Sequence, residues 1–349
     1  MTQFRPSRRD FLSASAATMV AAGAGTRARA AGSLVATTYP GSWEAAHRSI
    51  LVPAFTKATG AGVSLQTVQA LEAITKITAS RDNPPFDVVI LDEGPYLAAL
   101  DLDIFAPMPP SKVKNLAEVP ERFIDPNGYG AFVSAQILGI VYNPAKIKTP
   151  PTSWLDLWKP EYKGRVGITG LASSLGTAWL VEIAKLHGGS EANLEPGFEA
   201  INKLLPNVGA VAPNPGALAT LFQQGQIDIS FNYLNSVLPL ASRGVDIAIA
   251  KPDSGWVLIR NSMHVIKNTA NYDLACEYID TALSTEVQGK MASAPNYLAS
   301  TNKQVPFQSE LAKVAKDNEA LSHLTLIDWK TINPIRSALI ERFNRDVRI

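Results

Sequence analysis

The chain has 349 residues, with 32 Lys and Arg against 31 Asp and Glu. Residues 1–30 contain five of the basic residues and one acidic residue, so the chain from residue 31 onward holds 27 basic and 30 acidic residues. This weakly acidic balance argues against nucleic acid or an anionic membrane surface as a partner, because both attract basic proteins. The chain is longer than the size at which a single hydrophobic core stops growing, so we expect two lobes.

Residues 1–30 have the features of a twin-arginine export signal. Ser7-Arg8-Arg9-Asp10-Phe11-Leu12 precedes an apolar stretch over about residues 11–25, and Ala28-Arg29-Ala30 supplies small residues for cleavage. The apolar stretch is too short to span a bilayer. We therefore expect a signal peptide over 1–30, cleavage after Ala30, and a mature protein in the periplasm with no membrane insertion.

The first part of the mature chain alternates strand and helix patterns. Strand-like runs at 34–39, 62–68 and 86–91 are separated by a helical pattern over 43–58, with Ser42 as its N-cap. The run 86–91 is almost continuously apolar, which is typical of a strand buried in a parallel sheet. This alternation predicts an α/β fold with right-handed crossovers.

A second α/β unit of similar size follows without a linker. Strand patterns occur at 135–142, 165–169, 227–231, 246–250 and 261–266, and helical patterns at 154–162, 175–186, 272–283 and 285–292. We predict a hinged clamp in which residues 31–137 and 260–349, including the C-terminal helices, form lobe 1 and residues 138–259 form lobe 2. Two short crossings would join the lobes. Such a clamp buries a ligand between the carboxyl ends of its strands.

Motifs for catalysis or metal binding are absent from the sequence. The four histidines have no metal-ligand spacing, and no nucleophile elbow, phosphate-binding loop or dinucleotide fingerprint occurs. Asp92-Glu93 is the only acid pair at a strand end that could act as a dyad, and no partner base is apparent. The sequence thus favours a binding protein over an enzyme and requires no cofactor or metal.

Several segments of the mature chain share their order and spacing with one known family. They are YPGSW (39–43), residues 53–60, FDVVIL (86–91), LGIVYN (138–143), TSWLDLW (152–158), KGRV (163–166), SFN (230–232), IRNSMH (259–264) with 267–268, and residues 275–288 and 297–302. The chain resembles the periplasmic solute-binding proteins of ABC importers, in the subgroup of the spermidine/putrescine receptors and their iron- and thiamine-binding relatives.

This resemblance implies a two-lobe clamp of the type II periplasmic-binding-protein fold. The implied function is capture of a small organic solute by hinged closure and its delivery to an inner-membrane ABC permease, and we expect a monomer. Two alternatives stay open. An iron- or thiamine-type receptor is one, although an iron receptor would need adjacent tyrosines and residues 231–233 offer only Tyr233. An exported enzyme on the same scaffold is the other.

The resemblance also indicates which ligands to expect. Tyr39, Phe231 and Tyr297 stand where the polyamine receptors place pocket aromatics. The acids of those receptors are missing: Leu171, Ala172, Ser173 and Ser174 follow the strand that ends at Thr169, and Ile259 and Asn261 replace the expected Trp and Asp. These departures argue against a diamine or polyamine.

An amino-acid-like ligand fits the remaining residues better. Asp92-Glu93 would meet its amine, whereas the helix start at Ser173-Ser174 and the cation Arg260 would meet its acid group. The candidate ligand-binding residues are Tyr39, Trp43, Asp92, Glu93, Ser173, Ser174, Phe231, Asn232, Tyr233, Trp256, Arg260, Asn261 and Tyr297. Structural roles remain open for several of them: helix capping by Ser173 or Ser174, hinge packing by Trp256, core packing by Trp43 or Tyr297, and a salt bridge by Arg260.

Overall fold

The structure is a computed structural model that describes residues 32–321 and 323–348. The predicted signal peptide lies outside these residues. Within the described part of the chain, no helix is both long enough and apolar enough to cross a bilayer.

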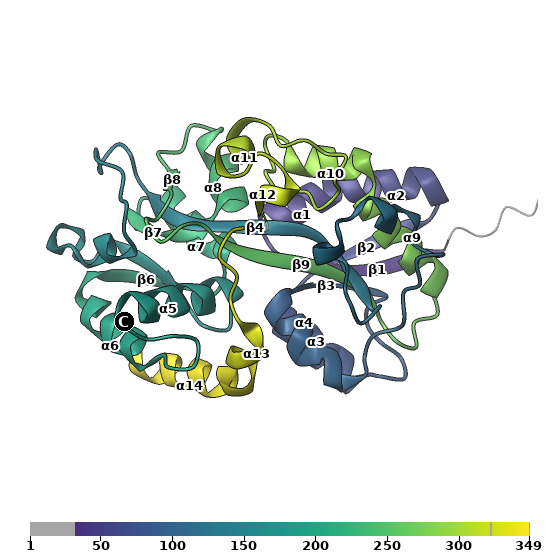
Figure 1. Cartoon of the computed structure of the whole chain (residues 1–349), viewed down its shortest axis with the longest axis horizontal. Coiled ribbons are helices and arrows are strands. Elements are labelled where there is room, and N and C mark those ends of the chain that lie inside the picture. Colours follow the sequence, from purple (N-terminus) through teal and green to yellow (C-terminus); the bar gives the residue numbers. More distant parts are fainter. Residues whose placement is uncertain (1–31, 322, 349) are drawn as a thin grey trace, which may run out of the picture.

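Strands and helices alternate through most of the chain (Figure 1). The strands are β1 (Ser33–Thr38), β2 (Gly62–Thr67), β3 (Val88–Asp92), β4 (Gly130–Tyr142), β5 (Val166–Thr169), β6 (Val208–Ala212), β7 (Ile229–Tyr233), β8 (Ala248–Ala250) and β9 (Val257–Val265). The helices up to β9 are α1 (Ser42–Ala46), α2 (Val52–Thr59), α3 (Ala70–Ala79), α4 (Glu93–Ala99), α5 (Ser174–Leu186), α6 (Glu195–Leu204), α7 (Pro215–Gln223) and α8 (Leu234–Ala241). The later helices are α9 (Tyr272–Leu283), α10 (Thr285–Ala292), α11 (Ser309–Val314), α12 (Asn318–Leu321), α13 (Trp329–Ile332) and α14 (Arg336–Asp346).

The described strands form one sheet in the order β2-β1-β3-β9-β4-β7-β5-β6, with β8 added beside β4. At its two ends the sheet is parallel, since β1 pairs with β2 and β3, and β5 pairs with β6 and β7. Antiparallel pairs join these ends through β9 and β4. The mixed sheet therefore carries two parallel α/β units, as the alternation of elements predicts. The antiparallel connection that joins them into one sheet was not predicted.

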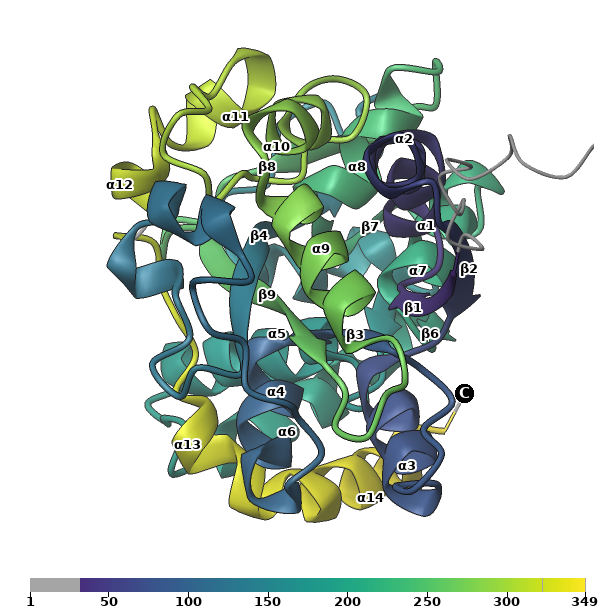
Figure 2. The ribbon, with the colours of Figure 1, turned by 90° about the vertical axis from the view of Figure 1, so that its right-hand side faces the viewer.

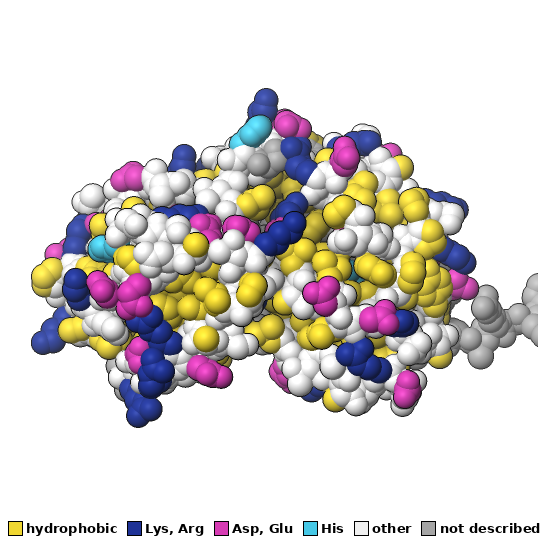
Figure 3. Space-filling model, turned by 60° about the horizontal axis from the view of Figure 1, so that its bottom comes forward, with side chains coloured by type: hydrophobic (Ala, Val, Ile, Leu, Met, Phe, Trp, Pro, Cys, Tyr) yellow, Lys and Arg dark blue, Asp and Glu magenta, His cyan; other side chains and the backbone are white. Residues whose placement is uncertain are grey.

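Two hydrophobic cores lie at opposite ends of this sheet, and we name the parts around them lobe 1 and lobe 2. Lobe 1 packs around β1, β3 and α9, with α3 and α4 on one side of the strands and α1 and α2 on the other (Figure 2). Lobe 2 packs around β5, β7 and α5, where the ring of Trp179 stacks on Phe231 with centroids 4.4 Å apart. In the space-filling view, an indentation separates two rounded masses along the lower edge (Figure 3).

The long strands β4 and β9 pass from one lobe to the other. Along β4, Ile137 belongs to the core of lobe 1 and the next residue, Leu138, to the core of lobe 2. A third segment makes the same passage between Leu324 and Ile327. It is attached to β9, because the Leu258 N–H donates to the Thr325 carbonyl over 2.8 Å. The third segment adds to the two crossings expected from the sequence.

The last two helices, α13 and α14, do not lie where the predicted lobe boundaries place them, whereas α9 to α12 do lie in lobe 1. Leu339 and Phe343 of α14 are buried in the core of lobe 2, whereas residues 260–349 were all expected in lobe 1. The apolar face of α14 covers apolar surface of lobe 2 that would otherwise face water. On the way there, α13 packs against α4: the ring of Trp329 occupies the space where a side chain at Gly94 would stand, and Asn333 donates to the Gly94 carbonyl over 2.8 Å.

Most predicted elements of the mature chain are present. The patterns over 272–283 and 285–292 are α9 and α10, whereas 154–162 forms two short 3₁₀ turns instead of an α-helix. The sequence patterns did not predict β6, α4, α6, α7, α8 or α11 to α14. Ser42 begins α1 but does not cap it, since Gly41 holds the cap position without a side-chain hydrogen bond.

Replacing Phe231 by Ala should destabilise the protein strongly, because Phe231 is completely buried and stacked on Trp179. We expect the free energy of unfolding to fall by about 3–5 kcal/mol, measured by urea unfolding of the mature protein. Leu186→Ala, at a side chain that is 40% exposed on α5, is the matched control and should cost far less. Equal losses in the two variants would contradict the assignment of Phe231 to the core.

Candidate ligand-binding site

A pocket lies where the carboxyl ends of the parallel strands of the two lobes face each other. From lobe 1 it is lined by Tyr39 after β1, Gln69 after β2 and Asp92 at the end of β3. From lobe 2 it is lined by Ser173 after β5, Pro215 after β6 and Tyr233 at the end of β7. Pro40, Ser42, Trp43, Gln136 and Ser236 complete the lining. The space between these residues, including the solvent-filled mouth, amounts to about 370 Å³.

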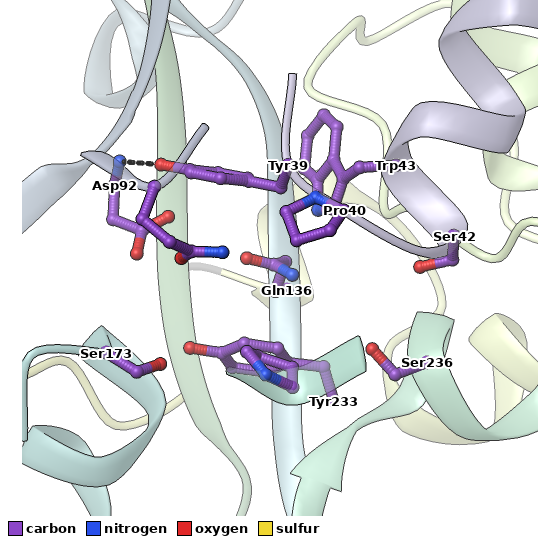
Figure 4. Close-up of a pocket in the computed structure, with 11 residues that line it drawn as sticks. Tyr39, Pro40, Ser42, Trp43, Asp92, Gln136, Ser173, Tyr233 and Ser236 are labelled. Carbon is purple, nitrogen blue, oxygen red and sulfur yellow. Dashed lines mark hydrogen bonds between the residues drawn. The ribbon is translucent and has the colours of Figure 1, made fainter. Parts of the chain in front are cut away.

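Two aromatic rings from different lobes face each other across this space. Figure 4 shows Tyr39 on one side and Tyr233 on the other, with Gln136 behind them. The Tyr39 hydroxyl accepts a hydrogen bond from the Asp92 N–H over 2.8 Å, and Trp43 packs edge-on against the Tyr39 ring. The Tyr233 hydroxyl has no hydrogen-bond partner among residues 32–321 and 323–348. Burial raises the pKa of both tyrosines, so both hydroxyls remain protonated.

Asp92 brings a carboxylate into the pocket. Its side chain points into the space between the two tyrosines in Figure 4, and the residue is 9% exposed. Asn261 of β9 donates to Oδ1 of Asp92 over 2.7 Å and also to Gln136 over 3.1 Å. Burial raises the pKa of Asp92, while Ser174, Tyr39, Arg336 and Asn261 oppose this effect. A carboxylate that burial destabilises in this way favours a cationic partner.

Arg336 at the start of α14 is a buried cation close to this carboxylate. The residue is 4% exposed, its Nη2 donates to the Ala172 carbonyl over 3.3 Å, and its guanidinium lies 5.3 Å from the centre of the Trp329 ring. Its Nε and Nη1 have no hydrogen-bond partner in the part of the chain that the structure describes. Burial lowers the pKa of Arg336, and the charge of Asp92 is the largest opposing influence.

The predicted cation Arg260 lies elsewhere. It forms an ion pair with Glu93, with Nε donating to Oε2 over 2.9 Å, and its Nη1 donates to the Arg122 carbonyl over 2.6 Å. The guanidinium also covers the ring of Phe132 at 4.5 Å. Arg260 was predicted either to bind the ligand or to form a salt bridge, and the structure has the salt bridge, within lobe 1. Neither Arg260 nor Glu93 lines the pocket.

The other candidates divide into pocket and packing positions. The pocket is lined by five of them: Tyr39, Trp43, Asp92, Ser173 and Tyr233. Asn261 does not line it but holds the Asp92 carboxylate through a hydrogen bond. Ser173 also caps α5 by accepting from the Leu175 N–H, and Ser174 is buried at the first position of that helix. The remaining candidates stand outside the lining: Phe231 in the core of lobe 2, Asn232 bonded to the Pro215 carbonyl, Trp256 against Gly139, and half-buried Tyr297 against the core of lobe 1.

The sequence reading missed several residues of the site. Gln69 and Pro215 follow strands, one of which was not predicted, and Gln136 lies in the middle of a crossing strand. Arg336 carries a signal that was available: it shares a helical face with Leu339 and Phe343, at the spacing of three and seven residues that marks a buried stripe. A cation in such a stripe needs a partner, and therefore points to a site.

Among the described residues, no group of three or more His, Cys, Asp and Glu side chains could hold a metal ion. The pocket instead combines two protonated tyrosines, one carboxylate and hydroxyl and amide groups. Such a set can bind a polar organic molecule through hydrogen bonds, ionic contacts and aromatic packing.

The chain belongs to the family of bacterial extracellular solute-binding proteins, whose family model matches residues 83–333. It is 24% identical over 301 residues to a probable ABC transporter periplasmic-binding protein of Sinorhizobium fredii, covering 84% of this chain and 81% of that protein. It is also 24% identical over 260 residues to the spermidine/putrescine-binding periplasmic protein of Escherichia coli, covering 71% and 72% of the two chains.

A crystal structure of an ABC transporter protein from Clostridium perfringens superposes with a TM-score of 0.69 at 28% identity, over 90% of this chain and all of that one. The predicted fold class, the family resemblance and the function class, a periplasmic substrate-binding component of an ABC transporter, are therefore confirmed. These relatives are solute-binding transport proteins and not enzymes.

Replacing Asp92 by Asn should raise the stability of the ligand-free protein at neutral pH, because Asn removes a buried charge and keeps the shape. The raised pKa of Asp92 means that its carboxyl group binds a proton more tightly in the folded state than in the unfolded state. Stability of the wild type should therefore fall relative to Asp92→Asn as the pH rises from the ordinary value of 3.8 through the raised pKa.

Thermal unfolding midpoints of both proteins between about pH 3 and 8 test this expectation. The difference should vanish at the acid end, where Asp92 is protonated in both states. A variant that is less stable than the wild type at neutral pH would show that the carboxylate is a net stabilising group.

Proposed function

We propose that this protein binds a small organic solute with an ammonium group between Tyr39 and Tyr233. Asp92 is the observation that carries the proposal: a buried carboxylate with a raised pKa faces the pocket between two aromatic rings. An ammonium group would neutralise the carboxylate and lie against the negative faces of the rings. The spermidine/putrescine-binding relative of Escherichia coli supports an amine as the recognised group.

A single carboxylate limits which amine fits. Asp92 is the only acidic side chain in the lining of this pocket, as far as the described residues show, and Glu93 is occupied by Arg260. A second ammonium group on the same ligand would be buried without a counterion, which is costly. The pocket thus favours a solute with one amine.

Closure of the two lobes would enclose the solute. The Asn235 amide of α8 donates to the Ser42 hydroxyl of α1 over 3.1 Å, so the lobes already touch at the mouth of the pocket. Next to this bond the backbones of Gly41 and Gly216 approach so closely that a Cβ on Gly41 would lie 3.5 Å from the Gly216 Cα. Ligand contacts from both lobes would favour this closed arrangement over an open one.

The cellular setting follows from the family and the N-terminal sequence. A twin-arginine signal over residues 1–30 would export the folded protein, which would act as a monomer in the periplasm. The closed form would then dock on an inner-membrane ABC permease and release the solute to it. No cofactor takes part in this cycle.

Isothermal titration calorimetry of the mature protein tests the proposal with a panel of putrescine, spermidine, γ-aminobutyrate, thiamine and ferric iron. We expect an organic amine to bind and Asp92→Asn to weaken it at least tenfold, equivalent to about 1.4 kcal/mol. Asp101→Asn, at an exposed position of lobe 1, is the matched control and should leave affinity unchanged.

Ferric iron as the tightest binder would contradict the proposal and favour an iron-type receptor. Full amine affinity in Asp92→Asn would equally contradict it, because the carboxylate would then play no part. A colorimetric hydrolase screen of the same preparation tests the alternative of an exported enzyme.

A further inference from the structure

We propose that Arg336 is a second ligand anchor, so that the pocket selects a zwitterion whose ammonium group meets Asp92 and whose carboxylate meets Arg336. This inference rests on the proposed function and narrows it to one class of solute. It also moves the anion-binding role from Arg260, where the sequence placed it, to a residue near the end of the chain.

The first support is the incomplete coordination of a buried cation. Arg336 is 4% exposed, yet among the described residues its guanidinium donates only to the Ala172 carbonyl, and Nε and Nη1 have no hydrogen-bond partner there. Buried guanidinium groups are normally paired with carboxylates or saturated with hydrogen bonds. Removing this cation from water without a partner is costly, and a ligand carboxylate would offset that cost.

The second support is the position of Arg336 relative to the pocket. Its charge acts on Asp92 and Tyr233, which both line the pocket, and its hydrogen-bond partner Ala172 directly precedes the lining residue Ser173. No ion pair within 4 Å joins Arg336 to Asp92 in the part of the chain that the structure describes. The charges of Asp92 and Arg336 therefore interact without forming a direct pair. Arg336 is not one of the lining residues in this structure, so a ligand carboxylate would reach its guanidinium beside Ser173.

The third support is the charge balance around the pocket. Glu93 and Arg260 neutralise each other outside the lining. Asp92 and Arg336 then leave the site with one charge of each sign, on lobe 1 and on lobe 2 respectively. A dication would meet one attractive and one repulsive charge, whereas a zwitterion would meet two attractive ones. The same balance explains why a member of a family with polyamine receptors lacks their additional acids.

Two probes of equal carbon number separate these cases. γ-Aminobutyrate and putrescine both have four carbons and share an ammonium group at one end. At the other end γ-aminobutyrate has a carboxylate, whereas putrescine has a second ammonium group. By calorimetry we expect the wild type to bind γ-aminobutyrate at least tenfold more tightly than putrescine. Arg336→Met should weaken γ-aminobutyrate at least tenfold and leave putrescine unchanged or tighter, because the repelling cation is gone.

Three further proteins make the result specific. Arg336→Lys keeps the charge and should retain part of the preference for γ-aminobutyrate. Arg342→Met removes an arginine of the same helix that pairs with Glu195 on the surface, and should change neither affinity. Circular dichroism melting curves of each variant show that it is folded.

The outcomes separate this inference from the proposed function. If the wild type binds putrescine as tightly as γ-aminobutyrate, or if Arg336→Met weakens both probes equally, Arg336 is not an anchor for the carboxylate and the inference is overturned, while amine binding stands. If the wild type binds neither probe, the proposed function fails together with the inference.

Discussion

The site depends on one hydrogen-bonded ladder, the antiparallel pairing of β4 with β9, which the two lobes share. From Gly130 to Leu138, β4 pairs with β9, and from Leu138 onward it pairs with β7. The same strand thus belongs to both lobes, so the shared strands β4 and β9 hold the lobes relative to each other. Because residues of both lobes line the pocket, its shape depends on how these strands place the lobes.

The two buried charges near the pocket, Asp92 and Arg336, lower the stability of the ligand-free protein and serve ligand binding. Asp92 and Arg336 are both buried, and burial shifts the pKa of each toward its neutral form. Replacing such groups by neutral side chains commonly stabilises a protein, so their presence is better explained by a ligand than by folding. The ion pair of Glu93 with Arg260 differs in this respect, because each charge already has its partner.

The sequence predicts the part of this site that depends on local pattern. Tyr39, Asp92 and Tyr233 directly follow or end apolar strands, and ligands bind at the carboxyl ends of parallel strands, so these residues could be found without a structure. Phe231 could not be separated from them, because its burial depends on Trp179 of a distant helix. For Arg336 the sequence offers only its place in a buried helical stripe. Its proximity to the site could not be predicted, because only the packing of α14 on lobe 2 brings it near Asp92, more than 200 positions earlier.

The central claim is that a ligand holds together two halves of a pocket that otherwise separate. Small-angle X-ray scattering of the mature protein, with and without a saturating amine that calorimetry has shown to bind, tests it most directly. We expect the radius of gyration to fall on binding, and the scattering curve of the saturated protein to fit the structure described here, in which Ser42 and Asn235 bridge the lobes. An unchanged radius of gyration with the amine bound would contradict the account.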